Sequence, residues 1–202
     1  MSDASREKVL ADLRAALPES SPLPELPPTG PWQTFEDPFA RFCEVLQVVG
    51  GTCHRVRTRQ EAHEQLQQMD EWKNAAVRVS VVDGVGDSTI DLDAIDDPHD
   101  LENVDYAVLH GHFAVAENAA IWVTDDTVKH RVLYFIPQRI VMVIPASQIV
   151  HNMHEAYSRL SVGQHAFAGF ISGPSKTADI EQSLVIGAHG ARALTVFAID
   201  EL

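Results

Sequence analysis

The stretch Ser172-Gly173-Pro174-Ser175-Lys176-Thr177-Ala178-Asp179-Ile180-Glu181-Gln182 lies between two apolar runs, residues 166–171 and residues 194–199. Short apolar runs of this kind are typical of strands that are buried on both faces of a sheet. The Gly-Pro pair predicts a tight turn after the first run, and the residues after it predict a helix over 177–186. A strand, a turn and a helix in this order indicate a fold of the α/β class.

The same turn predicts a site for a small anion. The first N–H groups of a helix have no partner within the helix, so a helix start that follows a tight turn can hold an anion. A lysine beside such backbone favours phosphate or carboxylate binding. The residues expected to bind the ligand are those of the turn and the helix start: Gly173, Pro174, Ser175, Lys176, Thr177 and Asp179. The alternative is a strand-to-helix turn without a ligand, in which Asp179 stabilises the helix start.

The rest of the chain predicts further helices and strands. Helical spacing of apolar residues predicts helices over 3–17, 38–49, 58–69 and 146–160. The second of these starts at Asp37 and Pro38, an N-cap followed by a proline at N1, and the third at the capping box of Thr58 and Glu61. Alternation predicts a short strand over 52–56, and apolar runs predict strands over 75–82, 104–109, 119–124, 132–136, 140–144, 166–171 and 194–199. Because helices and strands alternate along the chain, we expect an α/β sandwich with a largely parallel sheet.

The N-terminal part differs in composition from the rest. Six of the eleven prolines lie between residues 18 and 31, where they disfavour helix and favour extended chain. We therefore expect an N-terminal helix and a proline-rich arm over residues 1–33, and one α/β domain over residues 34–202. The arm either docks on the domain or on a partner, or it is a partly disordered leader.

Composition excludes several classes of function. The formal net charge of −14 opposes binding to nucleic acid and to anionic membranes. No apolar run reaches the ~20 residues that cross a bilayer, and the start of the chain lacks the apolar stretch of a secretory signal. We therefore expect a cytoplasmic protein without membrane insertion. The two cysteines cannot hold a four-cysteine iron–sulfur cluster without help from another chain.

A second candidate site surrounds Glu117. Small residues on both sides leave room for a substrate beside its carboxylate, so Glu117 is the candidate catalytic residue, acting as a nucleophile or a base. His110, Gly111 and Asn118 are expected to bind the ligand near it. The alternative for Glu117 is a structural role, in which its carboxylate accepts hydrogen bonds from backbone N–H groups of a turn.

Histidine is abundant, with ten in the chain. His110 and His112 would share one face of a strand, but a metal site needs three or four convergent ligands, and we expect none. His189 belongs to the sequence Gly187-Ala188-His189-Gly190 and is expected to border the same pocket as Ser175. There it is either a general base or a buried histidine that is held by backbone groups.

Residues 172–190 resemble the signature of the LUD-domain family, the LutC/YkgG-like lactate utilisation proteins. That signature reads Ser-Gly-Pro-Ser-Arg-Thr-Ala-Asp-Ile-Glu-Gln and then Gly-Val-His-Gly-Pro-Arg. Here Lys176 replaces the arginine and Ala191 the second proline, and a weaker resemblance extends back to about Asp37. Around Glu117 the family reads Ala-Glu-Thr-Gly-Thr, and this chain keeps the glutamate but has Asn-Ala-Ala at the last three positions.

The resemblance implies a three-layer α/β/α fold of the NagB/RpiA/CoA-transferase type, with ligand sites at the carboxyl ends of the strands. It implies an accessory subunit of a system that oxidises L-lactate to pyruvate, with a small anionic ligand such as lactate. LutA-like and LutB-like iron–sulfur proteins are the implied partners. The iron–sulfur clusters are therefore expected on those proteins, and this chain is expected to hold no cofactor.

Two alternatives stay open. The Ala-Glu-Asn sequence at Glu117 also resembles the Ser-Glu-Asn-Gly motif of family I CoA-transferases, which implies an acyl- or CoA-transferase-like enzyme with Glu117 as its nucleophile. The other alternative is a non-catalytic binding or interaction domain on an enzyme-like fold, since a fold does not determine a function.

Overall fold

The computed structural model describes residues 3–17, 22, 30, 32–160, 163–180 and 183–201. It divides into two compact units, Met1–Pro31 and Trp32–Leu202. The first unit contains the expected N-terminal helix, α1 (Asp3–Ala15). The side chains of Val9 and Leu13 on this helix are each more than half exposed.

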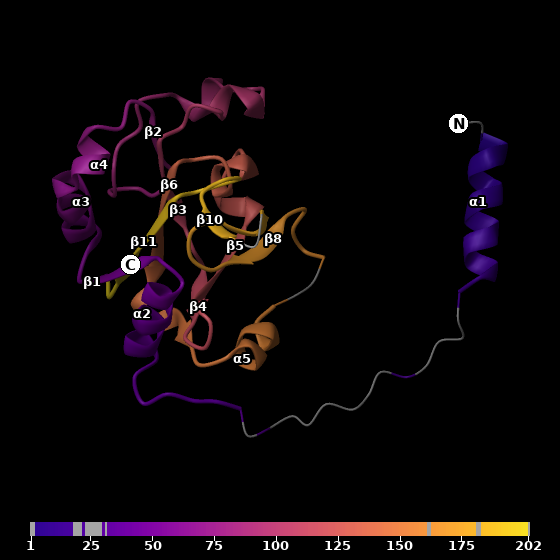
Figure 1. The fold of residues 1–202 in the computed structure, drawn as a ribbon, viewed down its shortest axis with the longest axis horizontal. Helices are drawn as coiled ribbons and strands as arrows, with labels where there is room; N and C mark the ends of the chain where they lie inside the picture. The colour runs from indigo at the N-terminus through magenta and orange to yellow at the C-terminus, as the bar shows by residue number, and fades with distance from the viewer. Residues whose placement is uncertain are drawn as a thin grey trace. The chain divides into compact units, whose positions relative to one another are not determined.

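The second unit is built on a parallel sheet (Figure 1). Within the described residues it has five strands, in the order β1 (Thr52–Val56), β11 (Ala193–Ile199), β6 (Arg139–Pro145), β3 (Tyr106–His110) and β2 (Arg78–Ser80). All neighbouring pairs run parallel, which confirms the largely parallel sheet expected from the sequence.

Two helices cover one face of this sheet. They are α3 (Arg59–Gln68) and α4 (Asp70–Lys73). Leu66 and Trp72 are fully buried against sheet residues such as Val141 and Phe197. Helix α3 begins where the sequence predicts, because the Thr58 hydroxyl accepts a hydrogen bond from the Glu61 N–H at 3.2 Å.

The other face is covered by a mixed layer of helix and sheet. The helix is α2 (Pro38–Val48), and the second sheet has the order β7 (Ile149–Val150), β4 (Phe113–Val115), β5 (Ala120–Thr124) and β8 (Ala168–Ile171). In this sheet β4 pairs parallel with β7, and β5 pairs antiparallel with both β4 and β8. Phe42 of α2 and Ile121 of β5 are fully buried in the core beneath this layer. The short strand β4 is absent from the elements predicted from the sequence.

Two predicted elements between residues 130 and 160 are wrong. The strand expected over 132–136 is the 3₁₀ helix η4 (Arg131–Tyr134). The long helix expected over 146–160 is divided into the 3₁₀ helix η5 (Ala146–Gln148), β7 and the shorter helix α5 (Met153–Ser158). The apolar residues of β7 fit helical spacing, but they pair with β4. Helix α5 begins only after Asn152, whose side chain accepts a hydrogen bond from the Glu155 N–H at 3.0 Å.

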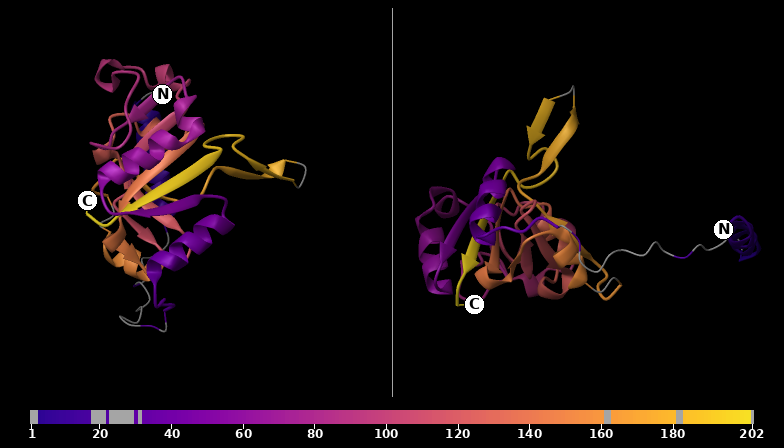
Figure 2. Two further views of the ribbon diagram at one scale, coloured as in Figure 1. Left: turned by 90° about the vertical axis from the view of Figure 1, so that its left-hand side faces the viewer. Right: turned by 90° about the horizontal axis from the view of Figure 1, so that it is seen from below.

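The helix expected over 177–186 is also wrong, because this segment is a β-hairpin. Its strands are β9 (Lys176–Ile180) and β10 (Ser183–Ile186), which pair antiparallel with Thr177 opposite Val185. Residues with β-branched side chains are frequent here, and they favour strand over helix. In both views of Figure 2 the hairpin projects from the body of this unit. Glu181 and Gln182 lie outside the described residues.

The chain that leads into α2 lies against α5. The ring of Trp32 stacks on His154 with a centroid distance of 3.5 Å. The Phe35 N–H donates to Nδ1 of His151 at 3.0 Å. These contacts attach the first residues of the second unit to its body.

The remaining short elements are η1 (Leu92–Ala94), η2 (Pro98–Leu101) and η3 (Asp125–Thr127). In the part of the chain that the structure describes, no helix has the length and apolar character that a membrane span requires.

Candidate functional site

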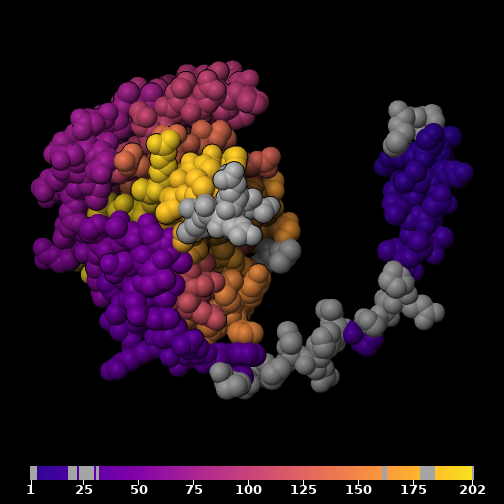
Figure 3. Space-filling model, in the orientation of Figure 1, coloured from indigo at the N-terminus to yellow at the C-terminus, as the bar shows by residue number. Residues whose placement is uncertain are grey.

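The signature segment lines a cavity of about 260 Å³ beside the base of the hairpin. Residues from three parts of the chain contribute to it: Tyr134, Phe135, Ile140, Phe170, Ile171, Ser172, Gly173, Pro174, Ser175, His189, Gly190, Ala191 and Leu194. Ile140 and Leu194 lie near the amino ends of β6 and β11. The cavity is therefore at the amino edge of the central sheet, whereas the resemblance implied ligand sites at the carboxyl edge. In Figure 3 the yellow residues of the hairpin stand in front of the body.

The turn of the signature packs on the end of α2. Gly173 has φ +71°, and a Cβ atom at this position would lie 2.9 Å from the carbonyl oxygen of Val49. Pro174 in turn lies against Gly50, where a Cβ atom would be 3.4 Å from its ring. Glycine is required at residue 173 both for its left-handed backbone and for this close approach.

The backbone of Ser175 closes the base of the hairpin. Its N–H donates to the carbonyl of Ala191 at 2.8 Å, and its carbonyl accepts from the Gly187 N–H at 2.9 Å. The predicted helix start with free N–H groups is thus absent, and the N–H of Ser175 is already used. The expectation that unpaired N–H groups of a helix start would hold an anion at this turn is therefore wrong.

The other predicted residues of the signature separate into two groups. Lys176 and Thr177 lie on β9, where Lys176 is exposed and is not among the residues that line the cavity. Asp179 is also on β9, and its side chain lies outside the described part of the structure. His189 is exposed and lines the cavity together with Ser175, so the structure brings these two residues together. Chemically, this cavity is lined by three hydroxyl-bearing residues, Tyr134, Ser172 and Ser175, and by the imidazole of His189, without a lysine or arginine.

Glu117 lies in the turn between β4 and β5, where its side chain is exposed. Its carboxylate accepts a hydrogen bond from the Met153 N–H at 2.9 Å, and its own N–H donates to the carbonyl of His151 at 3.1 Å. The carboxylate therefore satisfies a free N–H at the start of α5. This arrangement is the structural alternative that the sequence left open for Glu117.

The next two residues connect this turn to the signature. The carbonyl of Asn118 accepts a hydrogen bond from the Ser172 hydroxyl at 2.7 Å, and the Asn118 side chain accepts one from the Ala120 N–H at 3.2 Å. Ala119 has φ +53°, the conformation that favours glycine. Ala119 stands where the family motif has glycine, so the backbone has the left-handed conformation although the glycine is missing.

His110 and Gly111 lie at the other edge of the central sheet. His110 ends β3 and is half-buried, and burial lowers the pKa of its imidazole. A Cβ atom at Gly111 would overlap the Cγ2 atoms of Ile121 and Ile144, so tight packing alone requires glycine here. Neither His110 nor Glu117 lines the signature cavity, so the structure does not bring the second candidate site together with the signature.

Sequence reasoning missed the aromatic walls of the signature cavity. Tyr134 and Phe135 belong to a segment that the sequence predicted as a strand, and Phe170 belongs to β8. The rings of Tyr134 and Phe135 contact Phe167, just before β8, and one sequence does not reveal this contact between distant segments. Among the described residues, no three His, Cys, Asp or Glu side chains are grouped as a metal site would require.

Comparisons with known proteins agree with the signature. The family model described as LUD domain matches residues 98–199. Lactate utilization protein C of Bacillus pumilus is 34% identical over 106 residues, which are 50% of this chain and 44% of that protein. Lactate utilization protein C of Geobacillus sp. strain WCH70 is 27% identical over 139 residues, 65% of this chain and 54% of that protein. The chain thus spans about half the length of these relatives.

A solved structure has a similar fold. A DUF162 family protein from Deinococcus radiodurans superimposes with a TM-score of 0.57 and 18% sequence identity, over 80% of this chain and 96% of that one. At this identity the likeness concerns the fold alone.

Proposed function

The chain belongs to the LUD-domain family, and we propose that it is a non-catalytic component of a lactate utilisation system that assembles with iron–sulfur partner proteins. The name of its relatives, lactate utilization protein C, supports the connection to lactate. In this proposal LutA-like and LutB-like partners oxidise L-lactate to pyruvate, and this chain helps to hold them together.

The hairpin is the observation that carries the assembly role. Within the described residues, β9 and β10 pair only with each other and not with either larger sheet. A two-stranded hairpin is marginally stable by itself in water, and its outer edges carry N–H and C=O groups that can pair with another chain. The signature fixes the base of this hairpin through Gly173 and Ser175. We therefore assign the signature to presenting an arm that a partner binds.

The chemistry of the chain is consistent with redox centres on the partners. Cys43 lies on α2 and Cys53 on β1, and neither is in a disulfide. Two thiols are too few for a four-cysteine cluster. The carboxylate of Glu117 is engaged with the backbone of α5, which favours an assembly role over acyl transfer by this residue.

Co-purification tests the proposal. The full chain is co-expressed with LutA-like and LutB-like proteins of the same genome, and the amount of each partner that is captured is measured. Ile186→Asp places a charge on the hairpin at a residue that is 49% exposed. Val48→Asp is the matched control, because Val48 is 82% exposed on α2, outside the hairpin. We expect capture to fall at least tenfold for Ile186→Asp and to be unchanged for Val48→Asp. Equal capture by both variants, or no capture by the unaltered chain, would refute the assembly role.

A further inference from the structure

The assembly role leaves the two cysteines of the chain without a function. Cys43 is on α2 and Cys53 is on β1, and both side chains are half-buried. Both pack against the core cluster that contains Phe42 and Leu46 of α2. Helix α2 and strand β1 contact each other and lie side by side in Figure 1. One thiol from each of these two elements therefore borders the same part of the core.

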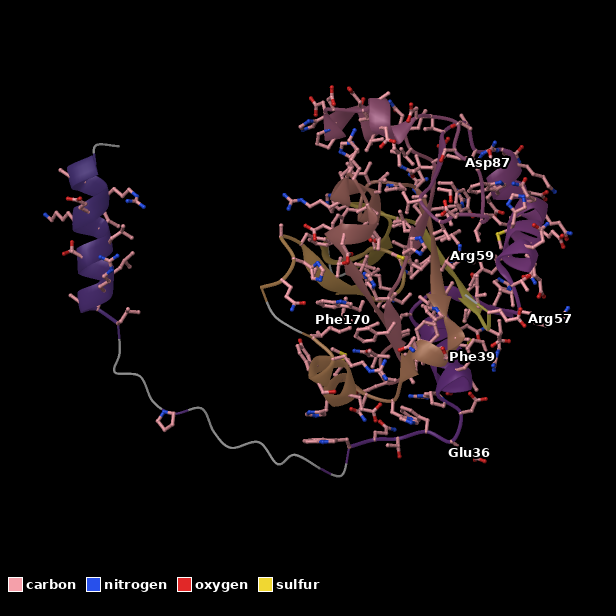
Figure 4. The ribbon with its side chains drawn as sticks, turned by 180° about the vertical axis from the view of Figure 1, so that it is seen from behind. Glu36, Phe39, Arg57, Arg59, Asp87 and Phe170 are labelled. Carbon is pink, nitrogen blue, oxygen red and sulfur yellow. The ribbon has the colours of Figure 1, made fainter. Side chains whose placement is uncertain are left out.

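Contacts near both ends of α2 show that β1 runs back along this helix. Near the turn, the Gly51 N–H donates to the carbonyl of Leu46 at 2.8 Å, and a Cβ atom on Gly51 would lie only 2.8 Å from a methyl carbon of Leu46. Near the start of the helix, the guanidinium of Arg55 lies over the ring of Phe39, 5.3 Å from its centroid. In Figure 4 Phe39 lies on the same side of the body as Arg57, which directly follows β1.

This arrangement places the two thiols opposite each other. Cys43 follows Phe39 by four residues, so the two side chains lie on the same face of α2. Cys53 precedes Arg55 by two residues, so these side chains lie on the same face of β1. Because Phe39 and Arg55 are in contact, Cys43 and Cys53 face each other at the next position toward the turn.

The two thiols differ in acidity, because one donates its proton to the other. The Cys53 S–H donates a hydrogen bond to the sulfur of Cys43, which lowers the pKa of Cys43, although burial and the charge of Asp37 oppose this effect. The same hydrogen bond, together with burial, raises the pKa of Cys53. Cys43 therefore forms a thiolate more readily, and the thiolate is the form that reacts with oxidants. Cys53 is a protonated thiol that lies beside it.

We propose that Cys43 and Cys53 are a reversible redox site, at which a peroxide converts the two facing thiols into a disulfide. The Cys43 thiolate attacks one oxygen of hydrogen peroxide, the O–O bond breaks, and hydroxide leaves, so that Cys43 becomes a sulfenic acid. This hydroxide takes up the proton that Cys43 had released and becomes water.

The second step forms the disulfide. The sulfur of Cys53 attacks the sulfur of Cys43, the S–O bond breaks, and the oxygen leaves as water with the proton of Cys53. In total, two thiols and one hydrogen peroxide give one disulfide and two waters. A dithiol reductant reverses the reaction by thiol–disulfide exchange and is itself oxidised to a disulfide.

The disulfide closes a ring that contains the support of the signature turn. The ring runs from Cys43 through the end of α2 at Val49 and Gly50 to Cys53. The signature turn packs on Val49 and Gly50. A cross-link lowers the conformational freedom of the chain that it encloses. Oxidation of the pair should therefore hold the base of the hairpin more firmly, and this inference does not depend on the assembly role.

Peptide mapping of the full chain tests the site. The chain is reduced, freed from reductant and treated with hydrogen peroxide, and its remaining thiols are alkylated before trypsin digestion without reductant. Trypsin releases residues 42–55 as one peptide with both cysteines, because Arg41 and Arg55 flank it and no lysine or arginine lies between them. We expect this peptide to lose two hydrogen atoms on oxidation and to regain them with dithiothreitol. Two alkylated thiols after peroxide treatment, or disulfides only between two chains, would refute the site.

Single variants test the roles of the two thiols. In Cys53→Ser the hydroxyl can still donate to Cys43, so Cys43 should form a sulfenic acid that dimedone traps. Cys53→Ala removes the donor, and its adduct should form at least threefold more slowly. In Cys43→Ser the adduct on Cys53 should form at least tenfold more slowly than the adduct on Cys43 in Cys53→Ser. Equal rates in the two serine variants would overturn the assignment of Cys43 as the attacking thiol, and equal rates in Cys53→Ser and Cys53→Ala would overturn the role of the donor.

Hydrogen exchange tests the effect on the hairpin. The N–H groups of Ser175 and Gly187 close its base, and both should exchange at least threefold more slowly in the oxidised chain than in the reduced chain. Cys43→Ser is the matched control, because it cannot form the disulfide, and peroxide should leave its exchange unchanged. Equal exchange in the oxidised and reduced forms of the unaltered chain would overturn the link between the redox site and the hairpin.

Discussion

Replacing Gly173 with alanine should weaken the attachment of the hairpin to the body. The residue has φ +71°, where an alanine costs about 1 kcal/mol. The added methyl group would lie 2.9 Å from both the carbonyl oxygen and a side-chain methyl of Val49, and overpacking of this kind costs about 1–3 kcal/mol. The lower entropy of the unfolded chain offsets about 0.5–1 kcal/mol. We therefore expect a net loss of about 1–3.5 kcal/mol in the free energy of unfolding.

Urea denaturation followed by tryptophan fluorescence measures this loss, since Trp72 is fully buried and reports on the unfolding of the body. Gly169→Ala is the matched control, because its methyl group meets no atom within 4 Å and its backbone is not left-handed. We expect this control to change stability by less than about 1 kcal/mol. If Gly173→Ala has the same unfolding midpoint as Gly169→Ala, the contact of the signature turn with Val49 does not constrain the hairpin, and our interpretation of the signature is wrong.

Three further predictions concern the turn at Glu117 and the histidine at the carboxyl edge. Glu117→Gln should reduce the free energy of unfolding by about 0.5–1.5 kcal/mol in the same assay, because a charged acceptor at the start of α5 is lost. In a separate experiment, hydroxylamine should trap no acyl adduct on Glu117 after incubation with a panel of acyl-CoAs. A trapped adduct would restore the enzymatic alternative. Ala119→Gly should change the free energy of unfolding by less than about 1 kcal/mol. The substitution relieves the strain of the left-handed backbone at φ +53°, but it also raises the entropy of the unfolded chain. A loss above about 2 kcal/mol would contradict the described turn. Burial holds the pKa of His110 in the folded chain below its value in the unfolded chain. As the pH is lowered, the unfolded chain therefore binds this proton at a higher pH than the folded chain, and the free energy of unfolding should fall below about pH 6.5. His110→Gln should reduce this fall in thermal melts between about pH 7 and 5, and an unchanged pH profile would show that His110 does not contribute.

Local signals in the sequence predicted the elements that local contacts determine. The helix over 38–49 was predicted from Asp37 and Pro38, and Asp37 indeed accepts from the Ala40 N–H at 3.0 Å. The strands β3, β6 and β11 of the central sheet were predicted because they are buried on both faces and therefore consist largely of apolar runs.

The errors occur where pairing between distant segments overrides the local pattern. Ile149 and Val150 fit the apolar stripe of a helix, but β4 pairs with them as a strand. Residues 177–186 follow a turn that often starts a helix, but they fold back on themselves as β9 and β10. The proximity of Ser175 and His189 was predictable from the signature, whereas the contact of Ser172 with Asn118 spans 54 residues and has no local signal.

The open edges of β9 and β10 also bear on how the protein is produced. Among the residues that the structure describes, both outer edges of the hairpin lack a neighbouring strand, so their hydrogen-bonding groups can pair with an extended strand, including the same hairpin of a second copy. If the hairpin is the arm of the proposed assembly, a chain made in excess over its partners should self-associate through these edges, and balanced expression of all components should prevent this. On the same proposal, the chain purified alone should aggregate through the hairpin, and the complete complex should not.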